Sequence, residues 1–201
     1  MKRILLIFAV SCLFFSCNAN VKNEESNNIA QNDNIVDTRV EKLKQSFEQN
    51  DYVTFFKLFP DTYDEFIDFY GFDDDTGKRP LYDFYETHIN YFFKYEEKVN
   101  SEIFAVKVYE IAKRGVWDAD GIGLFQSNLS ELIISKPNIF LEILTKKPDK
   151  EATSFWHFVF NGSGKYDLQN KEKFEKIYNS INSLDKKQGR LLKDEFEIMY
   201  K

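Results

Sequence analysis

The stretch DADGIGLFQSNLSELI, residues 118–133, decides the fold class of this chain. Its large apolar side chains recur at separations that place them on one face of an α-helix: Ile122, Phe125, Leu129, Leu132 and Ile133. Asp118 stands just before this run, where its carboxylate can accept hydrogen bonds from the free N–H groups of a first helical turn. Residues 118–133 are therefore predicted to form an amphipathic helix.

The same helical spacing continues in both directions along the chain, interrupted by Gly, Pro and capping residues. Helices are predicted within residues 37–47, 51–59, 61–70, 80–95, 101–115, 118–133, 137–144, 150–160, 170–181 and 185–199. Gly71 is predicted to end the third helix in the left-handed conformation, and Pro137 to open the seventh. Only residues 102–109, rich in Ile, Phe and Val, compete as a strand candidate.

The sequence thus predicts an all-α domain of about nine or ten short helices. The brief turns between them argue against a bundle of four long rods. Two arrangements stay open: a solenoid-like stack of helical hairpins, of the HEAT or armadillo kind, or an irregular orthogonal bundle. No convincing internal repeat is found at periods of about 33 to 47 residues, which are typical of such stacks.

The N-terminus has the layout of a secretory signal peptide. A basic start (residues 1–3), an apolar run (Ile4–Phe15) and the small Ser16 precede Cys17. This segment resembles the lipobox of bacterial lipoproteins, in which a lipid is attached to the cysteine thiol and cleavage leaves that cysteine as the new N-terminus. The resemblance implies a signal peptide at residues 1–16, acylation of Cys17, and membrane attachment through that lipid.

A second lipobox-like candidate ends at Cys12, after Ala9-Val10-Ser11. Cleavage there would leave a shorter apolar core in the leader and three exposed apolar residues in the mature chain, so Cys17 is the favoured acylation site. The resemblance implies a lipid-anchored protein of the bacterial cell envelope, with the outer membrane as the expected location.

Residues 17–36 are interpreted as the lipidated cysteine and a flexible polar tether, because they are rich in Asn and lack apolar periodicity. Residues 37–201 remain as a single all-α domain of ordinary size. Both cysteines, Cys12 and Cys17, precede this domain. The domain is therefore expected to have no disulfide and no thiol for catalysis or metal binding.

Charge and motifs argue against several functions. The chain has 27 Lys and Arg against 33 Asp and Glu without a long basic cluster, so nucleic acid is not an expected partner. His88 and His157 stand apart from any ligand or catalytic motif and are interpreted as packed side chains. The acidic run Asp73-Asp74-Asp75 lacks the glycine and glutamate of an EF-hand, although an unspecialised calcium site there stays open. No catalytic residue, metal or cofactor is predicted.

Aromatic residues are abundant, with 21 Phe, 11 Tyr and 2 Trp. Most are predicted to fill the core of a domain that has no disulfide to stabilise it. The alternative is an exposed patch for protein or glycan contact. Tyr82, Tyr91 and Tyr109 are the candidates for such a patch, because a tyrosine hydroxyl tolerates water.

The favoured function is a non-catalytic, membrane-anchored envelope lipoprotein that binds another protein, with an immunity or inhibitor protein as one version. Acidic surface steers association with a basic partner. The predicted contact residues are Asp73, Asp74, Asp75, Tyr82 and Tyr91. One alternative is a glycan-binding or nutrient-capture lipoprotein, which requires exposed Trp and Tyr in a cluster. Another is an undetected hydrolase, which requires carboxylates gathered around His88 or His157.

Overall fold

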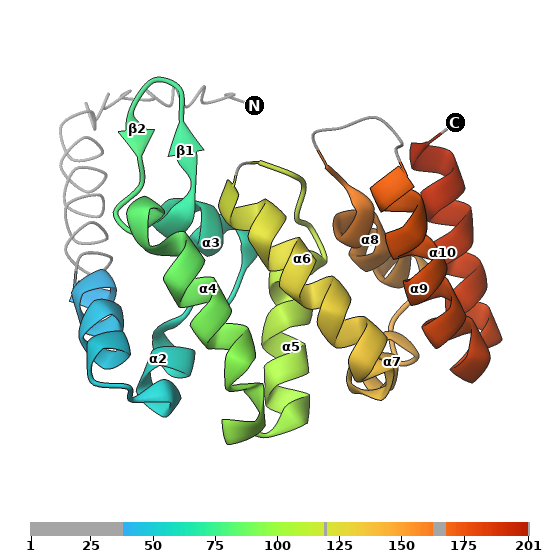
Figure 1. The fold of residues 1–201 in the computed structure, drawn as a ribbon, viewed down its shortest axis with the longest axis horizontal. Coiled ribbons are helices and arrows are strands. Elements are labelled where there is room, and N and C mark those ends of the chain that lie inside the picture. Colours follow the sequence, from blue (N-terminus) through green and yellow to red (C-terminus); the bar gives the residue numbers. More distant parts are fainter. Residues whose placement is uncertain (1–37, 119, 163–167, 201) are drawn as a thin grey trace, which may run out of the picture. The chain divides into compact units, whose positions relative to one another are not determined.

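The computed structural model describes residues 38–118, 120–162 and 168–200, and α-helices account for most of them (Figure 1). In chain order the elements are helical residues 38–48, α2 (Tyr52–Leu58), α3 (Tyr63–Tyr70), β1 (Phe72–Asp73), β2 (Gly77–Lys78), the 3-10 helix η1 (Tyr82–Phe84), α4 (Tyr85–Lys94), the 3-10 helix η2 (Glu96–Lys98), α5 (Ser101–Ala112), α6 (Asp120–Ser135), α7 (Pro137–Leu144), α8 (Asp149–Phe160), α9 (Leu168–Leu184) and α10 (Lys186–Met199). The all-α prediction is confirmed. The predictions for Cys12, Cys17 and the rest of residues 1–36 lie outside the described residues.

Several helices begin where the sequence predicts. The side chains of Asp51, Thr62 and Asp185 each accept a hydrogen bond from the N–H group three residues further along the chain. Pro137 occupies the first turn of α7, where its missing N–H removes no intrahelical bond. These boundaries follow from local hydrogen bonding, which is why the sequence alone locates them.

Ser101 and Asn170, which the sequence predicts as N-terminal caps, lie inside their helices. Asn100, not Ser101, caps α5, because the Asn100 Oδ1 atom accepts hydrogen bonds from two N–H groups of the first turn, at 2.9 and 3.1 Å. Ser101 is then the first helical residue. The ninth predicted helix begins at Leu168, so Asn170 lies inside α9 and does not cap it.

The strand candidate at residues 102–109 belongs to helix α5. Phe104, Val108 and Ile111 are fully buried, whereas Ile103 and Val106 are exposed to solvent. Burial thus recurs every three or four residues and not at every second residue, as it would in a half-buried strand. Packing of this face overrides the β-propensity of the Ile and Val residues.

Gly71 ends α3 but does not adopt the predicted left-handed conformation, since its φ is −72° and its ψ is 174°. Its N–H still bonds to the carbonyl oxygen of Ile67, and the chain then runs directly into β1. A β-carbon on Gly71 would lie 2.6 Å from the oxygen of Ile67. The close approach to the last turn of the helix, and not a positive φ, therefore favours glycine here.

Each helix from α2 to α8 packs against the helix two positions further along the chain: α2 on α4, α3 on α5, α4 on α6, α5 on α7, α6 on α8, α7 on α9 and α8 on α10. Figure 1 shows α4 and α6 running side by side, and α9 and α10 do the same. This order is typical of stacked helical hairpins. The stack is not regular, because α5 also contacts α8 and α6 also contacts α9.

The core is built largely from aromatic rings, which confirms their interpretation as core residues. The Phe92 ring stacks on Phe59 with centroids 4.2 Å apart, and on Phe104 at 5.0 Å. In the C-terminal part, Phe174 and Phe196 stack at 4.1 Å. Large flat side chains bury much apolar area each, so few residues per helix suffice to hold the stack together.

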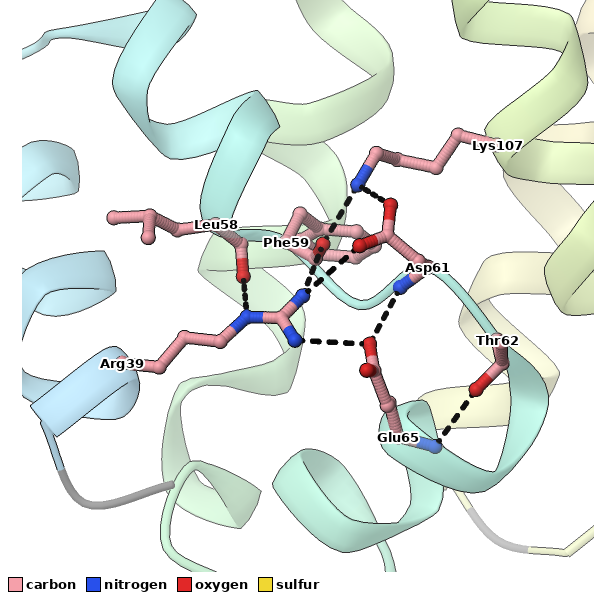
Figure 2. Close-up of polar contacts among 7 residues, drawn as sticks. All are labelled: Arg39, Leu58, Phe59, Asp61, Thr62, Glu65 and Lys107. Atoms are coloured by element: carbon pink, nitrogen blue, oxygen red, sulfur yellow. Dashed lines mark hydrogen bonds and ion pairs between the residues drawn. The ribbon is translucent and has the colours of Figure 1, made fainter. Parts of the chain in front are cut away.

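A charged cluster fixes the helix of residues 38–48 to the segment between α2 and α3 (Figure 2). The Arg39 Nε atom donates to the carbonyl oxygen of Leu58 at 2.9 Å, and Nη2 donates to that of Phe59 at 3.0 Å. The same guanidinium pairs with Glu65 at 3.0 Å and with Asp61 at 3.4 Å. One side chain thus bridges two carbonyl groups and two carboxylates.

Lys107 of α5 reaches the same segment from the other side (Figure 2). Its side chain is only 7% exposed, and its ammonium donates to the carbonyl oxygen of Phe59 at 2.8 Å and pairs with Asp61. Burial lowers the pKa of Lys107, and the Asp61 carboxylate counteracts part of that shift. The two cations, Arg39 and Lys107, are paired with the two carboxylates of Asp61 and Glu65. We therefore interpret the cluster as structural.

Candidate protein-contact surface

The acidic run predicted to be a loop forms the turn of a short hairpin. Phe72 and Asp73 pair antiparallel with Lys78 and Gly77. The Asp73 carboxylate accepts hydrogen bonds within this turn from the N–H of Asp75 at 3.0 Å, and from the N–H and the hydroxyl of Thr76 at 2.7 and 2.9 Å. These bonds lower the pKa of Asp73. Asp73 therefore organises the turn, whereas Asp74 and Asp75 are exposed.

An aromatic contact connects this hairpin to the start of α6. The exposed ring of Phe72 lies 5.8 Å from the half-buried ring of Tyr82, measured between centroids. The Tyr82 hydroxyl donates to Asp120 Oδ2 at 3.1 Å, and this bond raises the pKa of Tyr82. Figure 1 shows the hairpin and the first turn of α6 at the same end of the helices.

Trp117 lies in the segment between α5 and α6 and is 38% exposed. Its backbone N–H donates to the side-chain oxygen of Asn161, at the end of α8. A β-carbon on Gly123 would lie 3.9 Å from the Trp117 indole nitrogen, so the ring lies beside the first turns of α6. The neighbouring Val116 is exposed as well.

We group seven residues of the hairpin, η1, the segment between α5 and α6 and the start of α6 as a candidate surface, here called the aromatic–acidic surface: Phe72, Asp74, Asp75, Tyr82, Val116, Trp117 and Asp120. Contacts link Phe72 to Tyr82 and Tyr82 to Asp120, and Trp117 lies beside the first turns of α6. Among the described residues, no hydrogen bond or ion pair engages the carboxylates of Asp74 and Asp75. Exposed aromatic rings contribute strongly to binding at protein interfaces, and unpaired carboxylates attract basic partners. The surface can therefore supply both apolar contact and charge to a protein partner.

Two of the tyrosines suggested by the sequence do not reach this surface or any other. Tyr91 is 8% exposed and packs on Phe47 and Phe55, with ring centroids 5.1 and 5.0 Å apart. Tyr109 is buried, and its hydroxyl donates to Glu151 at 2.7 Å. The expectation that these two hydroxyls face water is wrong, because both rings lie on the inward sides of their helices. Tyr82 is the one of the three with partial exposure.

His88 is a packed side chain, as predicted. It is fully buried, its Nδ1 atom lies 3.1 Å from the hydroxyl oxygen of Tyr70, and its ring contacts Phe47 at 4.8 Å and Phe84 at 5.4 Å. Burial lowers the pKa of His88 to about 4, and the positive charge of Lys44 adds to that shift. A neutral histidine surrounded by rings serves packing.

His157 has a carboxylate neighbour, which the sequence does not reveal. Its Nδ1 atom lies 2.7 Å from Glu195 Oε1, so the pair links α8 to α10. A histidine held by one carboxylate is part of many catalytic sites, but it also commonly joins helices. Across the described stretches of the chain, no three His, Cys, Asp or Glu side chains gather closely enough to hold a metal ion.

Sequence reasoning missed Phe72, Val116 and Trp117 as surface residues. The available signal was their position: all three lie between predicted helices, within two residues of Gly71 or Gly115 and outside any helical spacing. An aromatic residue in such a segment is free of the packing role that its helical neighbours have.

Comparison of the chain with protein-family models, with curated proteins and with solved structures found no match. In the part of the chain that the structure describes, none of the helices combines the length and the apolar character that crossing a membrane requires.

Proposed function

We propose that this chain is a membrane-anchored envelope lipoprotein whose folded domain is a non-catalytic module that binds another protein through the aromatic–acidic surface. The observation that supports this most is the exposure of Trp117 and Phe72, at 38% and 44%, in a chain that buries most of its described aromatic residues. The Phe72 ring contacts the half-buried ring of Tyr82, whose hydroxyl bonds to Asp120 in the first turn of α6, and Trp117 lies beside the first turns of the same helix. Attachment through a lipid on Cys17 is proposed from the lipobox resemblance.

A basic protein is the partner that suits this surface. Asp74 and Asp75 extend from the hairpin next to Phe72, so a partner that covers the rings also meets two free carboxylates. Complementary charge of this kind speeds association and disfavours acidic competitors. An immunity or inhibitor protein that covers the active site of a basic toxin is one version of this proposal.

Glycan capture is the alternative function, and Trp117 and Tyr82 are the residues that favour it. It requires exposed Trp and Tyr in one cluster. Tyr82 bonds to Asp120 in the first turn of α6, and Trp117 lies beside the first turns of the same helix. Protein binding is preferred because unpaired carboxylates and the apolar Val116 belong to the same surface.

Site-specific photo-crosslinking in the full-length protein, in the bacterial envelope, tests the proposal. A photoreactive amino acid at position 117 should give a crosslinked protein, whereas the same amino acid at Ile198, which is 67% exposed on α10, should not. Phe72→Ala should weaken the crosslink from position 117. Equal products from both positions would contradict the proposal, and crosslinks to polysaccharide alone would favour glycan capture.

A further inference from the structure

A cavity of about 360 Å³ lies where the end of α5 meets the first turns of α8. Its lining residues are Lys113, Arg114, Lys150, Glu151 and Ser154. Three cationic side chains thus share a hollow with one carboxylate, in a chain whose net charge is −6. The cavity is therefore locally positive, although the net charge of the protein is negative.

Two of these three cations have no partner among the residues that the structure describes. Throughout the described stretches, no hydrogen bond or ion pair engages the guanidinium of Arg114 or the ammonium of Lys150, and both residues are exposed. Lys113 differs, because it pairs with Glu110 and its ammonium lies 5.8 Å from the centre of the Tyr109 ring. Arg114 and Lys150 are therefore available to an anion that enters the cavity.

The single carboxylate of the lining is engaged by the protein. Glu151 Oε2 accepts a hydrogen bond from the Tyr109 hydroxyl at 2.7 Å, and the Lys147 ammonium lies 4.7 Å from the centre of the same tyrosine ring. The Ser154 hydroxyl donates to the carbonyl oxygen of Lys113. A further cation, Lys147, thus contacts the tyrosine that bonds to Glu151. The local charge therefore stays positive despite the carboxylate of Glu151.

The first two turns of α8 contribute Lys150, Glu151 and Ser154 to the lining of the cavity. The N–H groups of Glu151 and Ala152 bond to the carbonyl oxygen of Pro148, while those of Asp149 and Lys150 stand ahead of the first intrahelical bond. The Asp149 carboxylate is paired with Lys187 at 2.5 Å. A helix N-terminus beside free cations favours an anionic group.

We infer that this cavity, the α5–α8 pocket, binds a phosphate group carried by a small molecule or by a lipid headgroup. A phosphate monoester has a charge of about −1.5 to −2 and three strong acceptor oxygens, which two free cations can match. The guanidinium of Arg114 can donate two parallel hydrogen bonds to it. The volume lies in the range of small-molecule sites. This site is separate from the aromatic–acidic surface and does not depend on the proposed function.

The test follows backbone amide NMR signals of the full-length protein in neutral detergent while a phosphate probe is added. The probes are inorganic phosphate alone and detergent micelles doped with phosphatidic acid. Saturable shifts of the Lys113, Lys150 and Ser154 amides with inorganic phosphate would identify a soluble ligand class. Shifts that appear only with the doped micelles would identify the lipid headgroup.

Matched variants separate a built site from general attraction between charges. Arg114→Gln with Lys150→Gln should weaken binding by about tenfold or more. Lys42→Gln with Lys57→Gln removes the same charge from exposed positions elsewhere and should leave binding unchanged. Equal weakening by both pairs would overturn the inference, as would the lack of saturable shifts with either probe.

Discussion

The hydroxyl of Tyr82 lies 3.1 Å from Asp120 Oδ2, and this hydrogen bond joins η1, next to the hairpin, to the first residue of α6. The two residues are 38 positions apart in sequence. This contact between side chains adds to the packing of α4 against α6.

Replacing Tyr82 by Phe removes this bond and keeps the ring. The free energy of unfolding should change little, because the bond is exposed and both partners can bond to water instead. Hydrogen exchange at the Arg79 amide, which bonds to the carbonyl oxygen of Gly71, should accelerate as the hairpin loosens. Tyr85→Phe is the control, and the same acceleration in that variant would mean that the Tyr82–Asp120 bond does not hold the hairpin.

His88 should make stability depend on pH. The folded protein holds His88 neutral down to a pKa of about 4, whereas an unfolded histidine takes up its proton near pH 6.5. Between these two pH values the unfolded state binds more protons than the folded state. The free energy of unfolding should therefore decrease as the pH is lowered from 6.5 to 4, by up to about 3 kcal/mol. Urea denaturation at several pH values measures the slope. His88→Phe should flatten it, and an unchanged slope would refute this role.

Lys107→Met should destabilise the protein by about 1–3 kcal/mol, because it leaves the buried carbonyl oxygen of Phe59 with one hydrogen bond fewer and removes the partner of Asp61. The methionine keeps most of the apolar stem, so packing changes little. Lys57→Met, at an exposed position of α2, is the matched control in urea denaturation. A loss of the same size in both variants would show that the cluster in Figure 2 contributes nothing specific.

Neutralising Asp74 and Asp75 to asparagine should leave stability nearly unchanged, because both side chains are exposed. It should slow association with the partner identified by crosslinking, and more so at low salt, since charges are screened over about 8 Å at physiological ionic strength. Asp194→Asn with Glu175→Gln removes two exposed carboxylates elsewhere and serves as the control. Asp73→Asn would not separate charge from stability, because the Asp73 carboxylate accepts hydrogen bonds that hold the turn together.

Cys17→Ala should release the protein from membrane fractions if the proposed lipid anchor is correct. Cys12→Ala should leave it attached, because Cys17 is the favoured acylation site. Fractionation followed by a high-salt wash measures both variants, and labelling with a radioactive fatty acid separates the two cysteines. Persistence of the Cys17→Ala protein in the washed membranes would contradict the anchor.

Helix identity was predictable because it depends on residues three or four apart. Asp51, Thr62 and Asp185 could be recognised as caps, since each bonds to an N–H group in its own first turn. The error at Gly71 has a different origin. Its backbone conformation is set by the hairpin that follows, which the sequence presented only as an acidic loop.

The candidate surface was less predictable, because burial depends on which helices pack together. Tyr82 and Tyr91 look alike in sequence, but only Tyr91 faces Phe47 and Phe55, which lie on two earlier helices. Lys107 is the reverse case. It is a charged residue that is buried, and its ion-pair partner Asp61 is 46 positions away in sequence. Contacts between residues so far apart in sequence cannot be predicted from the spacing of apolar residues within one helix.

Arg39 is the first residue of the unit that comprises residues 39–201. If the protein is tethered by a lipid upstream, any pulling force on that tether enters the folded unit next to this side chain. Its bonds to Leu58, Phe59, Asp61 and Glu65 all lie on one neighbouring segment and would be loaded together, not broken one after another. The guanidinium thus acts as a mechanical anchor point, and Arg39→Ala should lower the unfolding force measured when the protein is pulled from its N-terminus.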